Sequence, residues 1–286
     1  MRSLLFVPAD SARKLARAAC GADVVLIDLE DSVALSAKFL ARQMAGAFLA
    51  QPQRQSLGSK LYVRINGLDT GLADADLDAV MSERPDGIML PKSGSGRDVQ
   101  HLSAKLAVRE AECGLVDGST KIIAIATETA ASVFQLGTYA GCSPRLAAVT
   151  WGAEDLSADL GAQATRNAGG ALTTPFQLAR SLTLFGAVAA GVPAIDTVFT
   201  DFRDAAGLQA ECEAAARDGF TGKLAIHPGQ VAKIHAAFTP SARALDRAQR
   251  IIDLFAANPD AGVIGLDGQM LDRPHLVRAR RMLGLG

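Results

Sequence analysis

Eight short apolar segments recur along this chain of 286 residues, and nearly every one ends on a charged or polar residue. Segments that are apolar on both faces are typical of parallel strands buried between layers of helices. Helix-like stretches separate the segments, so predicted strands and helices alternate along the chain. Eight such repeats favour a parallel sheet that closes into a (β/α)8 TIM barrel. The segments begin at Leu4, Asp23, Leu61, Asp86, Ile122, Leu146, Ala194 and Lys223.

An open, doubly wound sheet is the alternative arrangement for alternating strands and helices. In that fold a glycine-rich GxGxxG turn commonly follows the first strand. Here the sequence DSARKL, residues 10–15, stands at that place. The closed barrel is therefore the favoured fold. The predicted helices cover residues 11–20, 36–50, 73–81, 99–113, 132–139, 176–190, 208–218 and 230–238.

The repeat ends at Phe238, and a different pattern follows it. Residues 243–257 have the spacing of a long amphipathic helix. Residues 261–274 are rich in Gly, Asp and Pro and are predicted to form a loop. A basic helix then covers residues 275–283.

This change of pattern predicts a catalytic barrel domain over residues 1–240 and a helical C-terminal extension over residues 241–286. We expect the extension to act as a lid over the barrel mouth or over a neighbouring subunit. The apolar stretch at the N-terminus stops at Asp10, which is too short for a signal peptide. Residues 182–195 are interrupted by Gly and Pro and are too short to span a bilayer. We therefore expect a cytoplasmic protein.

The composition argues against nucleic acid or an anionic membrane as a partner. Lys and Arg number 29 against 30 Asp and Glu, and aromatic residues make up 5% of the chain. Such a balance provides neither a basic surface nor a set of aromatic side chains for base stacking. The four cysteines form no CxxC pair, and their spacing fits no zinc site. Reduced thiols are the expected state.

Two carboxylates follow successive predicted strands. Glu128 ends the fifth segment and Asp155 ends the sixth, with Glu154 beside it. In a barrel these strand ends lie on the face that carries the active site. Paired carboxylates without a nearby His or Cys predict a site for Mg²⁺ or Mn²⁺. The alternative is that both residues cap the helices that follow them.

Arg64 lies inside the third apolar segment, in the sequence VRIN. An arginine in so apolar a strand needs a partner or must face the barrel mouth. Its fork of donors suits a substrate carboxylate or a developing alkoxide. The alternative is an ion pair with Asp28, Glu30 or Asp31 of the adjoining strand. The two interpretations are compatible, because these carboxylates can orient Arg64 while Arg64 binds substrate.

Four further residues allow a functional and a structural interpretation. Lys92 could form a Schiff base, although balancing the acidic cluster is favoured. His227 could act as a base or could shape the turn before Pro228. Lys14 and Arg13 could bind a phosphate, and a solvated helix face is the favoured alternative.

Asp267 and Asp272 lie in the C-terminal sequence LDGQMLDRP. A partly desolvated carboxyl with a raised pKa would suit general acid–base work there. Turn chemistry at Asp267 and a helix cap at Asp272 are the alternative. The residues by themselves favour this alternative.

A set of ordered motifs resembles the citrate lyase beta subunit-like proteins. They are the CoA-ester lyase branch of the HpcH/HpaI aldolase family, which includes malyl-CoA, citramalyl-CoA and citryl-CoA lyases. The resemblance covers essentially the whole chain. It implies a (β/α)8 barrel that uses Mg²⁺ to make or break a carbon–carbon bond beside an acyl-CoA thioester. The motifs are RSLLFVPA, DLEDSV, VRIN, LPK, TETA, WGAEDL, GFTGKLAIHP and LDGQMLDRP.

The resemblance also implies roles for single residues. Glu128 and Asp155 look like Mg²⁺ ligands, with Glu128 also next to the substrate. Arg64 looks like the contact to the oxo or hydroxy acid. Asp272 resembles the acid–base residue that such enzymes carry on the C-terminal segment. Lys14 and Arg13 become candidates for the phosphates of coenzyme A, and a homo-oligomer, a trimer or a multiple of trimers, is implied.

The implied reaction is retro-Claisen cleavage of a 3-hydroxy-3-carboxyacyl-CoA to acetyl-CoA and a 2-oxo acid. Three alternatives stay open. One is a class II aldolase acting on free 4-hydroxy-2-oxo acids without CoA. Another is a citrate lyase subunit that takes its acyl group from a carrier protein. The third is a non-catalytic binding barrel. The sequence leaves glyoxylate, pyruvate and oxaloacetate open as the 2-oxo acid, because a few pocket residues decide among them.

Overall fold

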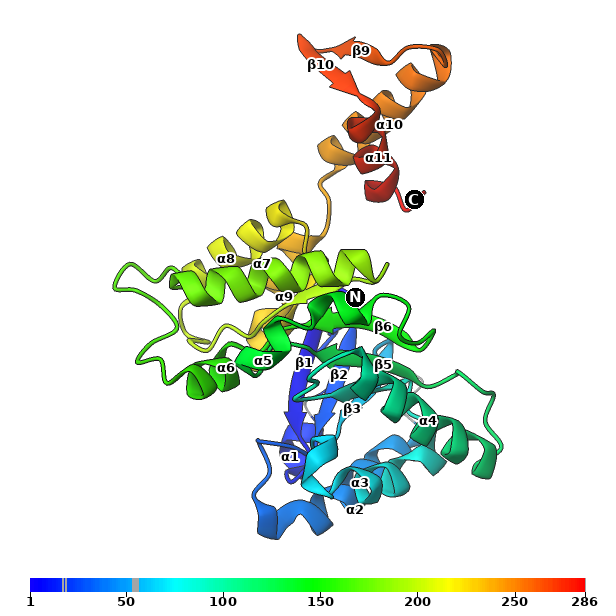
Figure 1. The fold of residues 1–286 in the computed structure, drawn as a ribbon, viewed down its shortest axis with the longest axis vertical. Coiled ribbons are helices and arrows are strands. Elements are labelled where there is room, and N and C mark those ends of the chain that lie inside the picture. Colours follow the sequence, from blue (N-terminus) through cyan, green and yellow to red (C-terminus); the bar gives the residue numbers. More distant parts are fainter. Residues whose placement is uncertain (17, 19, 53–56, 286) are drawn as a thin grey trace. The chain divides into compact units, whose positions relative to one another are not determined.

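The computed structural model describes residues 1–16, 18, 20–52 and 57–285, and the chain divides into two compact units, Met1–Phe238 and Thr239–Gly286. Within the described part of the first unit, eight parallel strands close into a barrel, and β1 pairs with β8 to complete the ring (Figure 1). The predicted barrel is confirmed. Its strands are β1 (Ser3–Pro8), β2 (Val24–Asp28), β3 (Lys60–Arg64), β4 (Gly87–Leu90), β5 (Lys121–Ile125), β6 (Leu146–Thr150), β7 (Ala194–Asp196) and β8 (Gly222–Ala225).

Side chains alternate between the two faces of each strand, and this alternation separates the core from the site. Leu26 and Tyr62 belong to an apolar cluster on the inner face of the barrel. Ile27 belongs to the larger cluster between the strands and the helices. Asp28 and Arg64 are register partners on β2 and β3. They follow Leu26 and Tyr62 by two residues, so the same alternation directs them into the barrel mouth.

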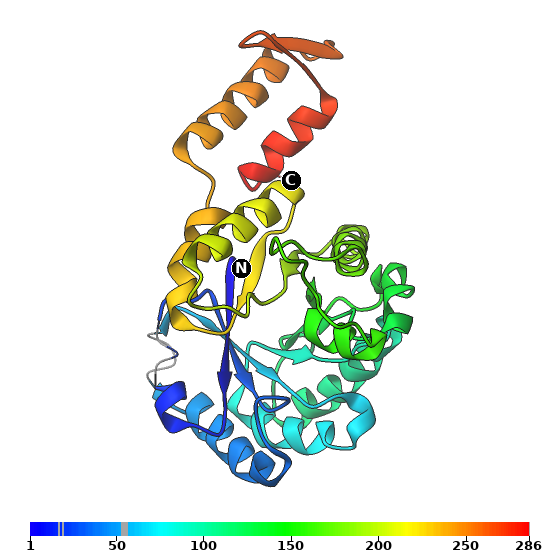
Figure 2. The ribbon, with the colours of Figure 1, turned by 90° about the vertical axis from the view of Figure 1, so that its left-hand side faces the viewer.

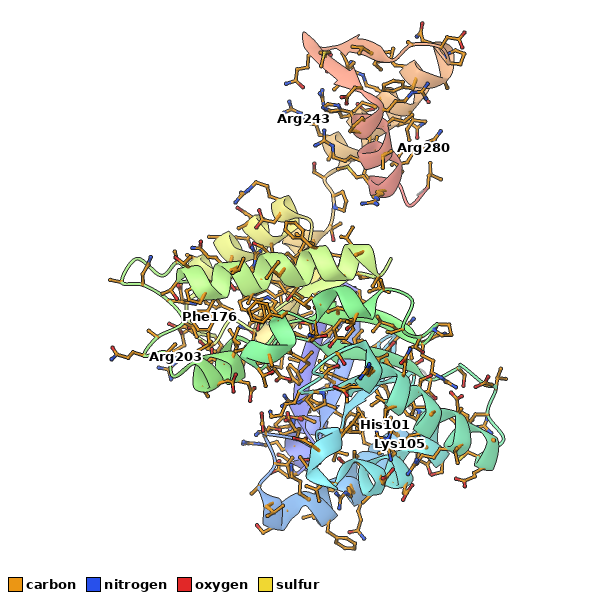
Figure 3. The ribbon with its side chains drawn as sticks, in the orientation of Figure 1. His101, Lys105, Phe176, Arg203, Arg243 and Arg280 are labelled. Carbon is orange, nitrogen blue, oxygen red and sulfur yellow. The ribbon has the colours of Figure 1, made fainter. Side chains whose placement is uncertain are left out.

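Helices connect the strands and cover the outside of the barrel (Figures 1 and 2). Phe176, labelled in Figure 3, is fully buried on α7. No described helix is long and apolar enough to cross a membrane. The helices of this unit are α1 (Ala12–Leu15), α2 (Lys38–Leu49), α3 (Ala73–Val80), α4 (Gly96–Glu112), α5 (Ala130–Val133), α6 (Ala153–Leu160), α7 (Thr174–Ala189), α8 (Ala205–Asp218) and α9 (Val231–Phe238).

Three helices differ from the sequence prediction. The helix predicted over residues 132–139 is divided into α5 and a 3₁₀ turn, Leu136–Tyr139. Helix α6 was not predicted, because its first residues, up to Asp155, were assigned to the end of the sixth apolar segment, and only Ala153 and Leu156 of this short helix are buried. Helix α1 covers only four residues of the predicted range 11–20, and positions 17 and 19 of that range lie outside the described residues.

The second unit contains α10 (Ala242–Ala257), β9 (Val263–Leu266), β10 (Gln269–Asp272) and α11 (Arg273–Met282). Side chains from all four elements form its own apolar cluster, which includes Ile251, Phe255 and Leu276. Arg243 and Arg280, labelled in Figure 3, are exposed on this unit. The expected C-terminal helices are therefore present.

The predicted loop over residues 261–274 is wrong, because β9 and β10 form an antiparallel hairpin there. Its turn residues Asp267 and Gly268 have φ angles of 50° and 75°. Positive φ at both positions is what a two-residue hairpin turn requires, and Asp-Gly supplies it readily. The Asp267-Gly268 dipeptide is typical of a hairpin turn, but the high Gly and Asp content of the segment led to the prediction of a loop.

Candidate active site

A cavity of about 330 Å³ opens among the carboxyl ends of the barrel strands. This is the face where (β/α)8 enzymes place their catalytic groups. Its wall combines apolar side chains with several carboxylates and the guanidinium of Arg64. The described residues that line it are Phe6, Pro8, Asp28, Asp31, Ser32, Arg64, Ile125, Glu128, Trp151, Gly152, Ala153, Glu154, Asp155, Thr197, Val198, Leu224 and Ile226.

Arg64 contacts two carboxylates, Asp28 at the end of β2 and Glu30 just after it. It donates Nε–H to Asp28 Oδ1 at 2.7 Å and Nη2–H to Asp28 Oδ2 at 2.6 Å. Its Nη1 lies 2.8 Å from Glu30 Oε2, and its guanidinium stands 4.6 Å from the centre of the Phe6 ring. Burial lowers the pKa of Arg64, but Asp28 and Glu30 more than offset this and raise it. The expected ion pair is present, and Arg64 also reaches the cavity.

Glu128 is almost fully buried, with 3% of its surface exposed. Burial raises its pKa to about 8, although the backbone N–H of Lys92 donates to its Oε2 and acts in the opposite direction. A Cβ atom at Gly152 would lie 2.6 Å from Cγ of Glu128. Only glycine therefore allows Glu128 to occupy this position, because real Cβ contacts are longer.

Lys92 links the carboxylates of the cavity through its side chain. Its Nζ lies 2.7 Å from Glu30 Oε1, 3.0 Å from Asp155 Oδ1 and 3.4 Å from Asp31 Oδ2. Burial lowers the pKa of this amine, but Glu30, Glu128 and Asp155 more than offset burial, so that the net shift is upward. A Schiff-base amine must be neutral to attack a carbonyl. The geometry therefore supports the charge-balancing interpretation of Lys92.

Lys92 also has an unusual backbone, with a φ angle of 50°. Positive φ costs free energy for a residue other than glycine. Here it allows one residue to direct its backbone N–H to Glu128 and its ammonium to Asp155.

Glu128 and Asp155 do not cap helices, so the structural alternative for this pair is wrong. The hydroxyl of Thr129 caps α5, and Gly152 occupies the N-cap of α6. Burial raises the pKa of Asp155, but hydrogen bonds with Lys92 and Glu128 and the charges of Lys92 and Arg64 together outweigh burial, and the net shift is downward. Glu128 and Asp155 thus present carboxylate oxygens to one cavity. Among the described residues, no group of three or more His, Cys, Asp or Glu is arranged to hold a metal ion.

Two supporting residues escaped the sequence analysis. Lys38, at the start of α2, donates from Nζ to the carbonyl oxygens of Leu29 and Glu30 at 2.7 and 2.8 Å. It thereby fixes the segment that carries Glu30. Trp151 lines the cavity and donates Nε1–H to Asp196 Oδ1 at 2.7 Å. Nothing in sequence spacing identifies Lys38, whereas Trp151 is the single tryptophan of the chain.

Other predicted residues lie apart from these contacts. His227 accepts the backbone N–H of Gly229 on Nδ1 at 3.1 Å, and its ring stacks on Phe202 at 5.1 Å. The turn-shaping interpretation of His227 is therefore supported. Lys14 and Arg13 are exposed on α1, which follows β1 at the carboxyl face.

Asp272 belongs to the second unit, where it occupies the N-cap of α11. Its Oδ1 lies 2.5 Å from Nδ1 of His275, and 40% of the carboxyl surface is exposed. The favoured alternative, a helix cap at Asp272, is therefore present, and the hydrogen bond to His275 lowers the pKa of Asp272 instead of raising it. Asp267 occupies the hairpin turn and forms ion pairs with Arg247 and Arg250.

Comparisons with known proteins give one consistent family. Residues 2–228 match the model of the HpcH/HpaI aldolase/citrate lyase family. The chain is 34% identical over 285 residues to citrate lyase subunit beta of Escherichia coli K12, covering 99% of this chain and 92% of that protein. It is 32% identical over 292 residues to a (3S)-malyl-CoA thioesterase of Cereibacter sphaeroides, covering 99% and 93%.

Solved structures agree with the sequence comparison. The CitE protein of Mycobacterium tuberculosis, crystallised with magnesium, acetoacetate and coenzyme A, superposes with a TM-score of 0.79. The two chains are 34% identical, and the match covers 99% of this chain and 97% of the other. A related structure of that protein contains oxaloacetate and magnesium, with a TM-score of 0.71 and 34% identity over 83% of this chain and 96% of the other. The chain belongs to the HpcH/HpaI aldolase/citrate lyase family of carbon–carbon lyases.

Proposed function

We propose that this protein is a Mg²⁺-dependent acyl-CoA lyase. It would cleave a 3-hydroxy-3-carboxyacyl-CoA reversibly to acetyl-CoA and a 2-oxo acid. The observation that carries the proposal is the presence of Glu128, Asp155 and Arg64 on the wall of one cavity. The magnesium and coenzyme A bound to the related M. tuberculosis protein support it.

The carboxylate pair fits a magnesium ion. Mg²⁺ in proteins is commonly held by one or two carboxylates, with water and substrate oxygens completing its shell. Glu128 and Asp155 supply two such groups. Burial raises the pKa of Glu128, so a bound cation would favour its ionised form. We propose Glu128 and Asp155 as the ligands, with Mn²⁺ as a possible substitute. When bound, the ion supplies Lewis acidity to the oxygens of the 2-oxo acid portion.

Arg64 binds the acid portion of the substrate. Asp28 and Glu30 fix its guanidinium without using all five of its N–H groups. The remaining donors can hold a carboxylate or the hydroxyl oxygen. As that oxygen loses its proton and becomes a ketone, Arg64 stabilises the negative charge that develops on it.

Asp272 is proposed as the residue that exchanges a proton with the methyl carbon of acetyl-CoA. This role comes from the family resemblance of its segment. The lowered pKa keeps Asp272 ionised near neutral pH, which fits removal of a methyl proton in the condensation direction. In the cleavage direction the hydroxyl proton of the substrate has to reach the enolate carbon, and Asp272 would accept that proton and then give it to the carbon, so that the carboxylate is regenerated.

The proposed partners are acyl-CoA and 2-oxo acid molecules, with Lys14 and Arg13 placed near the phosphates of coenzyme A. A homo-oligomer, a trimer or a multiple of trimers, completes the proposal. Size-exclusion chromatography with light scattering would test the oligomeric state.

Product analysis tests the reaction directly. The full chain is incubated with Mg²⁺ and malyl-CoA, citramalyl-CoA or citryl-CoA, and we expect acetyl-CoA and the matching 2-oxo acid. Release of free CoA and hydroxy acid instead would identify a thioesterase. Turnover only of free 4-hydroxy-2-oxo acids would identify an aldolase, and turnover only of a carrier-bound thioester would identify a lyase subunit. Full activity in EDTA would refute the metal requirement.

Deuterium exchange tests Asp272. The methyl group of acetyl-CoA should exchange with D₂O in the wild-type protein, and Asp272→Asn should stop this exchange while acetyl-CoA still binds. Unaltered exchange would remove Asp272 from the mechanism.

A further inference from the structure

We infer that Lys38 is a positioning residue for the reaction in the cavity. It holds the backbone of Leu29 and Glu30 through hydrogen bonds. The carboxylate of Glu30 in turn holds Arg64 and Lys92. Lys38 lies at the start of α2 and is not among the described residues that line the cavity, so it would act only through these neighbours. The inference rests on the proposed function.

The ammonium of Lys38 is unusual for a buried charge. The residue is 9% exposed, and both hydrogen bonds that the described residues give its Nζ are to carbonyl oxygens rather than to carboxylates. Burial lowers its pKa, although the charges of four nearby carboxylates act in the opposite direction. A buried charge commonly costs stability compared with an apolar side chain of similar volume. Stability alone is therefore a weak reason for a lysine at this position, whereas holding two carbonyl groups requires its donors.

Leu29 has further partners that fix it to the barrel. Its carbonyl oxygen also accepts Nδ2–H of Asn66 at 3.1 Å, and its N–H donates to the carbonyl oxygen of Arg64 at 2.9 Å. Asn66 is itself buried and held by Asp76, whose Oδ2 accepts the backbone N–H and Nδ2–H of Asn66 at 2.7 and 2.6 Å. Leu29 would therefore keep its position without Lys38.

The backbone of Glu30 depends more strongly on Lys38. Its N–H donates to Asp28 Oδ1 at 2.9 Å, and its carbonyl oxygen accepts the N–H of Val33 at 2.9 Å. Both partners lie within three residues of Glu30, so these bonds shape the turn without tying it to a helix. Among the described residues, the hydrogen bond from Lys38 ties this backbone to α2.

The carboxylate of Glu30 joins two cations. Its Oε1 lies 2.7 Å from Lys92 Nζ, and its Oε2 lies 2.8 Å from Arg64 Nη1. Oε2 makes no aligned hydrogen bond among the described residues, so its attraction to Arg64 is an ionic contact that no hydrogen bond fixes in direction. If Glu30 moves, the ammonium of Lys92 is left with Asp31 and Asp155. It would then compete with a metal ion for Asp155.

Lys38→Met tests this role, because methionine fills much of the same space without the charge or the donors. We expect kcat to fall by roughly 100-fold with KM little changed, since a misplacement of about 1 Å at a transition-state donor has an effect of this size. Arg64 keeps its two hydrogen bonds to Asp28 and still binds the acid. Lys38→Arg, which keeps the charge and the donors, should retain most of the activity. A wild-type kcat in Lys38→Met, or equal losses in the two variants, would overturn the inference.

A control variant separates positioning from stability. Arg145 is buried and pairs with Glu110 just before the amino end of β6, whereas the cavity lies at the carboxyl ends of the strands. Arg145→Lys should lower the melting temperature without changing kcat. If kcat follows the melting temperature in both Lys38→Met and Arg145→Lys, the role of Lys38 is merely structural and the inference fails. Should Lys38→Met not fold, Lys38→Gln, which also lacks the charge, is measured against the same criteria.

Magnesium binding gives a readout that does not depend on turnover. Mg²⁺ alone is titrated calorimetrically into the full-length wild type and the variants. Lys38→Met should raise the Kd for Mg²⁺ by about tenfold, as for loss of a residue that supports metal ligands from outside the coordination shell. Arg145→Lys should bind Mg²⁺ as tightly as the wild type.

The same titration distinguishes this inference from the proposed function. If the wild type binds Mg²⁺ but cleaves no CoA ester, only the proposed function falls, and the Kd of Lys38→Met decides the inference. An unchanged Kd in that variant would overturn the inference while the proposed function stands. A wild type that binds no Mg²⁺ would overturn both.

Discussion

Two buried ionic networks of the barrel unit differ in their balance of charge. In the network at the cavity, the two cations Arg64 and Lys92 face five carboxylates. In the described network beside β7 and β8, three cations face three carboxylates in a continuous chain of contacts. We call them the cavity network and the β7–β8 network. The carboxylates of the cavity network are Asp28, Glu30, Asp31, Glu128 and Asp155. The β7–β8 network consists of the carboxylates Asp196, Glu211 and Asp218 and the cations Arg166, Arg180 and Lys223.

One carboxyl in each network illustrates the difference. In the β7–β8 network, burial raises the pKa of Asp196, but Lys223, Arg180 and Trp151 together outweigh burial and lower it. In the cavity network, Arg64 and Lys92 lower the pKa of Asp28 and Asp155, but burial dominates at Glu128 and raises its pKa to about 8. The β7–β8 network is balanced in charge, although the buried Nη2 of Arg180 has no hydrogen-bond partner among the described residues. The unbalanced network has spare negative charge, which is what a cation and a substrate require.

The largest expected effect is the loss of turnover in Asp155→Ala. This change removes a proposed metal ligand from the unbalanced network, so turnover should fall by about 10⁴-fold or more. The melting temperature of the metal-free protein should fall only slightly, because Asp155 is partly exposed and Lys92 keeps Glu30 and Asp31 as partners. Steady-state kinetics and thermal melts in EDTA check the two parts. A large drop in melting temperature would mean that both networks serve stability.

The reverse outcome is expected for Asp196→Ala in the balanced network. The change leaves Lys223, which is fully buried, with one carboxylate fewer and removes the acceptor of the Trp151 N–H. Breaking a buried pair in this way should cost about 3 kcal/mol of stability. Chemical denaturation measures it, and Asp196→Asn, which keeps an acceptor for Trp151, serves as the control. Unchanged stability would contradict the structural assignment of this network.

Arg64→Lys should have a smaller effect than the loss of Asp155. Lysine keeps the charge but lacks the fork that two N–H groups present to Asp28. We expect kcat/KM to fall by roughly 100-fold, in the range for removing a transition-state donor. Wild-type kinetics in this variant would show that only the charge of Arg64 matters.

The smallest expected effect is a dependence on pH. A carboxyl with a lowered folded pKa stabilises the fold above its unfolded value and loses that contribution as pH falls through the folded value. The pKa of Asp196 lies below 3.8. The difference in stability between wild type and Asp196→Asn should therefore shrink below about pH 4. Melting curves between pH 7 and pH 3 would check this, and a constant difference would contradict the lowered pKa.

The barrel could be predicted because its signal is local. Each parallel strand is buried on both faces, so a short apolar run marks it, and polar residues at the ends of the runs mark the site. The pairing of Arg64 with the carboxylates at the end of β2 was also foreseeable, since adjoining strands bring them together. Helix α6 escaped prediction, because it begins shortly after β6, so that its first residues were assigned to the strand segment.

Contacts set by tertiary structure could not be predicted. The hydrogen bonds of Lys38 to two carbonyl groups and the approach of Glu128 to Gly152 depend on how distant segments pack. The lowered pKa of Asp272 likewise depends on how close its carboxyl lies to the ring of His275 at the start of α11. Sequence spacing shows that Asp272 and His275 are near each other, but not that they touch.

One residue determines how freely the two proposed metal ligands can move. The backbone N–H of Lys92 contacts Glu128, and its ammonium contacts Asp155. Any displacement of the segment between β4 and α4 therefore moves the partners of both carboxylates together. A substitution at Lys92 would therefore change the contacts of both carboxylates at once while leaving both carboxylates in the chain.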